Sequence, residues 1–113
     1  MAKVLYVEDE DMLRRAVSRM VQRSRHEFLV VGSRDQAREV FDRETFDVVI
    51  ADYYLEYGFT GVQLLQELKI KKPTLKCVVT SGGCPPIEES WILELHKPFN
   101  LEELDKTLDE VLG

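Results

Sequence analysis

The chain has 113 residues, 44% of them apolar and 32% charged, which is the balance of one globular domain rather than of a disordered segment. Its 15 Lys and Arg against 21 Asp and Glu give a net charge of −6, and this acidic balance argues against direct binding to nucleic acid. No apolar run is long enough to span a membrane or form a signal peptide, and the cysteines, Cys77 and Cys84, fit no disulfide framework, so we expect a cytoplasmic protein.

Strand and helix patterns alternate along the first half of the chain. Lys3–Val7 is apolar and β-branched, which is typical of a buried strand. Apolar residues spaced three and four apart predict a helix over Asp11–Ser24, and Glu27–Val31 is predicted as a second strand. Ser33 and Gln36 form a capping-box pattern, which indicates that a second helix begins there.

The second half continues this alternation. Phe46–Ala51 is a third strand and the most apolar run of the chain. A capping-box pattern at Thr60 begins a third helix, which must end near Lys72 because a proline follows. Two more strands and a last helix complete the chain: Lys76–Thr80, Ile92–Leu95 and a helix that begins at Asn100.

This alternation predicts an α/β fold, in which helices cover both faces of a parallel sheet. Ligands of such sheets bind beyond the carboxyl ends of the strands. Polar residues follow four of the predicted strands: Glu8, Asp9, Glu10 and Asp11; Asp52; Thr80 and Ser81; His96 and Lys97. Clustered carboxylates suit Mg²⁺, and a hydroxyl with an ammonium group suits a phosphate. The sequence therefore predicts a metal and phosphate site at this edge of the sheet.

Each of these groups also has a simpler interpretation. Glu10 and Asp11 could complement the dipole of the helix that follows, and Thr80–Gly83 could be an ordinary turn. Asp52 is harder to explain without a function, because burying a carboxylate at the end of the most apolar strand is costly unless it has a partner or a function. The order of the groups, each after a successive strand, favours a shared site.

Four segments together resemble the receiver domains of bacterial two-component response regulators: Val4–Glu10, Asp47–Asp52, Val78–Gly82 and Leu95–Phe99. The resemblance covers residues 1–113 as one domain and implies a flavodoxin-like doubly wound fold, with a five-stranded parallel sheet in the order 2-1-3-4-5. It implies a phosphoacceptor and not an enzyme acting on other substrates. The implied donor is a sensor histidine kinase or histidine phosphotransfer protein, and the implied output is contact with an unknown downstream protein.

The resemblance also implies a role for each matching residue: the phosphoacceptor Asp52; the Mg²⁺ ligands Glu8, Asp9, Asp52 and the backbone carbonyl of Tyr54; the switch hydroxyl Ser81; and the phosphate-binding Lys97. Thr80, one residue earlier, is the alternative switch hydroxyl. The family also leads us to expect a cis peptide bond between Lys97 and Pro98.

The sequence departs from the family pattern between Ser81 and Lys97. Only 15 residues separate them, and two prolines lie early in this segment, so we expect the family's fourth helix to be missing or reduced to a turn. The result would be a remodelled face over residues 82–95, including Trp91, through which a partner or a homodimer could form. Glu94 stands where the family has an aromatic switch residue. The family's usual allosteric output therefore cannot be expected of this chain from the resemblance alone.

Two other functions stay open at this stage. Without the fourth helix and the aromatic residue, the domain could be a pseudo-receiver, an interaction module that acts without phosphorylation. A flavodoxin-like cofactor enzyme is the other possibility, but it needs a phosphate-binding loop after the first strand. The segment Glu8–Glu10 is anionic there and would repel a phosphate that no metal accompanies.

Overall fold

Five parallel strands form one sheet in the order β2-β1-β3-β4-β5, as predicted, in a computed structural model that describes residues 1–113. The strands are β1 (Lys3–Val7), β2 (Glu27–Val31), β3 (Val48–Asp52), β4 (Lys76–Ser81) and β5 (Ile92–His96). The helices are α1 (Asp11–Val21), α2 (Arg34–Arg43), α3 (Gly61–Lys71) and α4 (Leu101–Leu112), with a short 3₁₀ turn at Glu56–Gly58. None of these helices has the length and apolar character that crossing a membrane requires.

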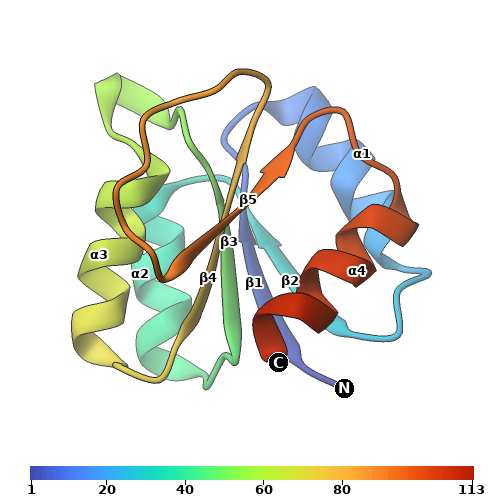
Figure 1. Cartoon of the computed structure of the whole chain (residues 1–113), viewed down its shortest axis with the longest axis horizontal. Coiled ribbons are helices and arrows are strands. Elements are labelled where there is room, and N and C mark those ends of the chain that lie inside the picture. The colour runs from blue at the N-terminus through green and yellow to red at the C-terminus, as the bar shows by residue number, and fades with distance from the viewer.

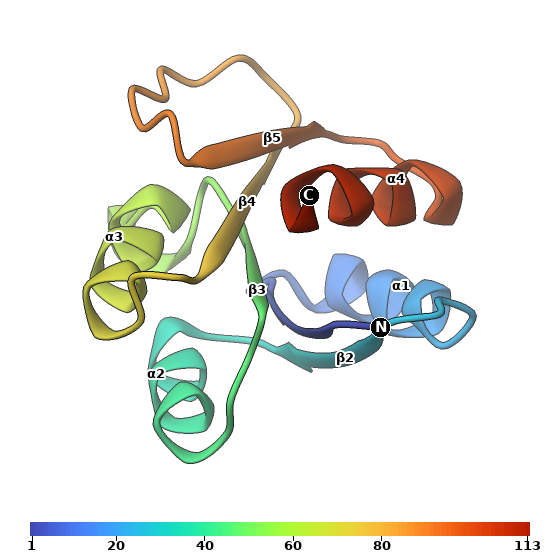
Figure 2. The same ribbon diagram turned by 60° about the horizontal axis from the view of Figure 1, so that its bottom comes forward.

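The sheet lies between two layers of helices. Helices α1 and α4 cover one face and α2 and α3 cover the other, as Figures 1 and 2 show. Side chains alternate between the two faces along each strand, so Val4 and Tyr6 of β1 join the core under α1 and α4. Leu5 and Val7 join the core under α2 and α3. This alternation decides which side chains at the strand ends can meet.

The predicted helix starts are confirmed at three helices. Ser33 accepts a hydrogen bond from the backbone N–H of Gln36, and Thr60 and Asn100 each form a complete capping box. Such a cap typically stabilises a helix by about 1 kcal/mol. Several boundaries differ from the prediction by one to three residues: α1 ends at Val21, β3 begins at Val48, and β3, β4 and β5 each extend one residue further, to Asp52, Ser81 and His96.

The connection between β4 and β5 contains no helix, which confirms the prediction for this segment. Residues 82–91 instead run as a loop beside α3 (Figures 1 and 2). Ile87 and Trp91 of this loop pack against the core under α2 and α3. The Lys69 ammonium lies 5.6 Å from the centre of the Trp91 ring, and Gln66 of α3 donates a 2.7 Å hydrogen bond to Glu89. Trp91 therefore packs inward, and the loop covers part of the core under α2 and α3.

Truncating Trp91 should lower the stability of the domain. Because the half-buried indole covers part of the core, we expect Trp91→Ala to reduce the free energy of unfolding by about 2–3 kcal/mol. Urea unfolding followed by circular dichroism measures this. Ile70→Ala, which removes a side chain of α3 that is 81% exposed, should change stability by less than about 0.5 kcal/mol. A Trp91→Ala variant of unchanged stability would contradict the inward packing.

Candidate functional site

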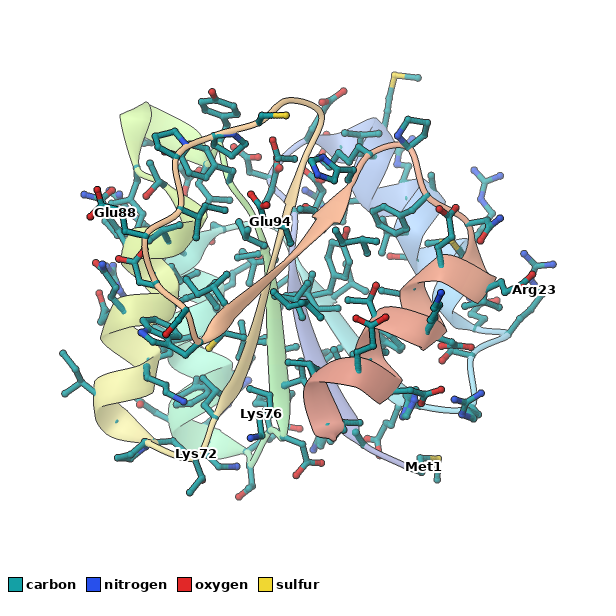
Figure 3. All side chains as sticks on the ribbon, viewed as in Figure 1. Met1, Arg23, Lys72, Lys76, Glu88 and Glu94 are labelled. Carbon is teal, nitrogen blue, oxygen red and sulfur yellow. The ribbon has the colours of Figure 1, made fainter.

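The predicted polar residues meet at the carboxyl edge of the sheet, at the upper ends of the strands in Figure 1. Asp52 is the last residue of β3, Glu8 follows β1 and Lys97 follows β5. The opposite edge is marked by Lys72, Lys76 and Met1 in Figure 3. The strand order places β1 and β3 side by side at the centre of the sheet, so Glu8 and Asp52 become neighbours.

The Lys97 ammonium lies between two buried carboxylates. Its Nζ is 3.0 Å from Oε1 of Glu8 and 3.1 Å from Oδ1 of Asp52. The Glu8 side chain is 1% exposed and that of Asp52 is 12% exposed. Because the ion pairs are shielded from water, removal of the Lys97 charge would leave both carboxylates without compensation. The Lys97–Pro98 peptide bond is cis, as expected.

Burial sets the direction of the pKa shift for the two carboxylates but not for the lysine. It raises the pKa of Glu8 and of Asp52 above their ordinary values, although the Lys97 ammonium acts in the opposite direction on both. For Lys97, burial opposes the charged form, but the hydrogen bond to Glu8 and the attraction of Asp52 outweigh it and raise its pKa. The site therefore keeps its cation at neutral pH and contains carboxylates that are more basic than usual.

A third carboxylate completes an all-oxygen cluster. Glu8, Asp9 and Asp52 each offer one oxygen, and these oxygens lie within 4.8 Å of one another. This donor set is the kind that Mg²⁺ prefers, and the spacing lets one small ion contact more than one carboxylate. The residues present therefore fit the predicted metal. Tyr54, the fourth predicted ligand through its carbonyl, is held by an isolated β-bridge to Thr60, and its side chain is exposed.

The two hydroxyl candidates at the end of β4 differ in their surroundings. Ser81 is buried, and its hydroxyl accepts a 3.0 Å hydrogen bond from the backbone N–H of Gly83. Thr80 is completely buried, and its hydroxyl has no hydrogen-bond partner. By the alternation of β4, Thr80 faces the core under α1 and α4, on the same side as Val78. Glu94 lies exposed on β5, the strand that crosses the front of Figure 3.

The acidic residues that follow β1 have separate environments. Asp11 begins α1 and pairs with Arg14, so its simpler interpretation as a helix-start acid holds. Arg14 belongs to none of the motifs at the strand ends, but its guanidinium also donates to the backbone carbonyls of Glu8 and Asp9 at 3.3 Å and 3.4 Å. Its only signal in the sequence is its position one turn into α1. Arg14 thus stabilises the backbone of the loop that contains Glu8 and Asp9.

Gly61 allows α3 to begin directly against the end of β3. Its N–H donates a 2.8 Å hydrogen bond to the carbonyl of Tyr53. A Cβ atom at this position would lie 2.2 Å from the backbone oxygen of Asp52, which is far inside contact distance. The absence of a side chain at Gly61 is therefore a condition for the placement of Asp52.

Adding a methyl group at Gly61 should destabilise the domain. We expect Gly61→Ala to lower the free energy of unfolding by about 2–3 kcal/mol, because the backbone of Asp52 must move away from the new atom. Gly82→Ala is the matched control: no atom lies within 4 Å of the added Cβ, so its stability should stay within about 0.5 kcal/mol of the parent. Thermal unfolding of the two variants compares them, and equal melting temperatures would refute the close approach.

Comparison with known proteins identifies relatives over almost the whole chain. The model of the family described as "Response regulator receiver domain" matches residues 4–109. The response regulator protein FleR of Pseudomonas aeruginosa is 42% identical over 81 residues, which are 72% of this chain and 17% of FleR. The transcriptional activator protein PfeR of the same bacterium is 30% identical over 115 residues, which are 97% of this chain and 37% of PfeR. The chain thus spans less than half the length of both relatives.

The fold itself is shared with solved structures. The crystal structure of the Vibrio cholerae chemotaxis protein CheY4 superposes with a TM-score of 0.86 at 27% sequence identity, over 98% of each chain. The similarity thus extends from the motifs at the strand ends to the arrangement of the whole sheet.

Proposed function

The chain belongs to the response regulator receiver domain family, and from this premise we propose that it accepts a phosphoryl group on Asp52 from a sensor histidine kinase or histidine phosphotransfer protein. The contact of Lys97 with both Glu8 and Asp52 carries this proposal, because it places a cation beside a buried carboxylate at the carboxyl edge of the sheet. Residues 1–113 would act as one cytoplasmic domain, and its output would be contact with a downstream protein. It would be a phosphoacceptor and not an enzyme acting on other substrates.

In the proposed reaction, an oxygen of the Asp52 carboxylate attacks the phosphorus atom of a phosphohistidine. The P–O bond forms as the P–N bond breaks, and the imidazole nitrogen keeps the electron pair. Burial makes the Asp52 carboxylate more basic, which favours attack, and the nearby Lys97 stabilises its ionised form. The protein supplies positioning and charge stabilisation, which are the main requirements of phosphoryl transfer.

Glu8, Asp9 and Asp52, with the backbone carbonyl of Tyr54, are the residues that would hold Mg²⁺. When bound, the ion would offset the repulsion between the Asp52 carboxylate and the incoming phosphoryl oxygens. Glu8 also keeps Lys97 close to the acceptor through their 3.0 Å contact. The carboxylates therefore have two tasks, since they bind the metal and they orient the ammonium group.

Lys97 and Ser81 would bind the phosphoryl oxygens after transfer. Ser81 would exchange its hydrogen bond with Gly83 for one to the phosphoryl group, whereas Thr80 is enclosed in the core under α1 and α4. Contacts that exist only in the phosphorylated state can shift a conformational equilibrium, typically by about 1–3 kcal/mol. We therefore prefer Ser81 to Thr80 as the switch hydroxyl.

Incubation with acetyl phosphate tests the proposal directly. In the presence of Mg²⁺, intact-mass spectrometry should detect one added phosphoryl group per chain. With EDTA in place of Mg²⁺ the added mass should be absent or much reduced, because the carboxylates then repel the donor. A folded chain that gains no mass in Mg²⁺ would reject the proposal and leave the pseudo-receiver as the function.

The pseudo-receiver is the second candidate because this chain lacks two features through which receiver domains usually signal. Residues 82–91 form a loop in place of a helix, and Glu94 is exposed on β5. A homodimer through residues 82–95 has less support. Ile87 and Trp91 pack inward, which leaves acidic residues such as Glu88 and Glu94 exposed on this face. Like charges brought together by a twofold axis would oppose self-association.

A further inference from the structure

The loop that carries Glu8 and Asp9 is held by an arginine from the first turn of α1. The guanidinium of Arg14 donates to the backbone carbonyls of Glu8 and Asp9 at 3.3 Å and 3.4 Å. Both bonds come from the same nitrogen, Nη1, while Nη2 pairs with the Asp11 carboxylate. The charged pair thus orients the guanidinium, and its other nitrogen faces two consecutive carbonyls of the loop.

The neighbouring loop at the carboxyl edge provides the space for this guanidinium. Gly32 follows β2, and a Cβ atom there would lie 2.7 Å from Nη1 of Arg14. The three atoms nearest to that position all belong to Arg14. Gly32 has no positive φ angle, so its backbone conformation does not require a glycine. What requires it is the space that Arg14 occupies.

The loop after β2 is a firm support for the guanidinium. The N–H of Gly32 donates a 2.7 Å hydrogen bond to the Gln36 side chain in α2. The N–H of Glu8 donates to the carbonyl of Val31 at 3.0 Å, which joins the two loops beside Arg14. The guanidinium is therefore confined between a fixed loop and the carbonyls of two residues of the acidic cluster.

We propose that Arg14 is a positioning residue for magnesium binding and that Gly32 provides the space it needs. This role rests on the proposed function, in which Glu8 and Asp9 help to hold the ion. Bonds to two consecutive carbonyls fix the main chain from which both carboxylates project, and these carboxylates must keep the spacing that one ion requires. If the bonds are lost, Mg²⁺ must order the loop as it binds, which lowers its affinity.

Gly32→Ala is the most direct test, because it preserves every charge of the site. The added methyl group should displace the guanidinium from the carbonyls of Glu8 and Asp9. Loss of a hydrogen bond that supports a metal ligand typically weakens metal binding about 10- to 100-fold. Because the bonds here act on the main chain, we expect the dissociation constant for Mg²⁺ to rise by less, about three- to tenfold. An NMR titration of the backbone amide shifts with Mg²⁺ measures it.

The stability of the metal-free chain separates positioning from general damage. The group displaced in Gly32→Ala is the end of a flexible side chain, so the urea midpoint should not fall. Gly82→Ala is the matched control, because nothing lies within 4 Å of its added Cβ, and its Mg²⁺ affinity should equal that of the parent. A weaker Mg²⁺ affinity accompanied by a lower urea midpoint in Gly32→Ala would overturn the positioning role.

Arg14→Lys removes the same contact from the other side. It keeps the positive charge, but a single ammonium cannot pair with Asp11 and hold both carbonyls as the planar guanidinium does. We expect Mg²⁺ binding to weaken as in Gly32→Ala, and the double variant should be no weaker than either single variant, because both substitutions remove one shared contact. Arg15→Lys, at an exposed position on the same helix, should bind Mg²⁺ like the parent.

The outcomes distinguish this role from the function on which it rests. If the parent chain binds Mg²⁺ and either Gly32→Ala or Arg14→Lys binds it equally tightly, the positioning role is wrong and the proposed function stands. If the effects of the two substitutions multiply in the double variant, Gly32 does not act through Arg14 and the proposed pairing fails. A parent chain whose amide shifts do not respond to Mg²⁺ would reject the metal site and the positioning role together.

Discussion

Asp52→Asn should abolish the gain of a phosphoryl group from acetyl phosphate, in Mg²⁺ concentrations that fully modify the parent chain. The amide that replaces the carboxylate is not a nucleophile for phosphorus, and it provides one fewer negative charge for the metal. We expect the modified fraction to fall below detection by intact-mass spectrometry. This is the largest functional effect that the site predicts for a single substitution.

The Asp52→Asn variant should remain folded, so its failure would be chemical. Lys97 keeps its 3.0 Å contact with Glu8, and the buried negative charge removed is one that burial already disfavours. Asp42→Asn is the matched control, because Asp42 forms only a surface ion pair with Lys71 at 2.9 Å. This control should be modified like the parent. Persistent modification of Asp52→Asn at the parent rate would move the acceptor to another residue and reject the proposed function.

Lys97→Met should be the most destabilising substitution of a charged residue in the domain. It leaves Glu8 and Asp52 in the interior without their shared cation, and both must then remain unpaired or take up protons. Breaking a buried ion pair by removing one partner costs about 3–5 kcal/mol, and we expect about 3 kcal/mol at pH 8 because Lys97 is partly exposed. Urea unfolding at fixed pH measures the loss.

The loss should depend on pH in a defined direction. Burial raises the pKa of Glu8 and of Asp52 in the folded state, and removal of Lys97 raises both further. The folded state then binds more protons than the unfolded chain, so stability is retained below the unfolded pKa values, near pH 4, and falls as pH rises through the folded ones. The deficit of Lys97→Met should therefore be smaller at pH 5 than at pH 8.

The control for this prediction is Lys71→Met, which removes a lysine from a surface pair with Asp42. We expect a change of less than about 1 kcal/mol with little dependence on pH. A Lys97→Met deficit that is equal at pH 5 and pH 8 would show that lost packing, and not uncompensated carboxylates, explains the destabilisation.

The elements of the fold could be predicted from the sequence because their signals are local. The capping residues Ser33, Thr60 and Asn100 lie within three residues of the groups they bind, and the apolar strands have short, continuous signals. The prolines after Ser81 and the shortness of that segment were sufficient to predict the missing helix. The order of polar residues along the chain placed the candidate site at one edge of a parallel sheet.

The sequence could not show how distant residues meet, because those contacts depend on the packing of whole elements. Glu8 and Lys97 are 89 positions apart, and only the closed sheet reveals that one ammonium contacts both Glu8 and Asp52. The inward packing of Trp91 is likewise decided by neighbours from other strands and helices. Composition and periodicity thus determine which elements form and which edge carries the polar groups. Distance and burial, which determine charge pairing and pocket shape, arise only when those elements pack together.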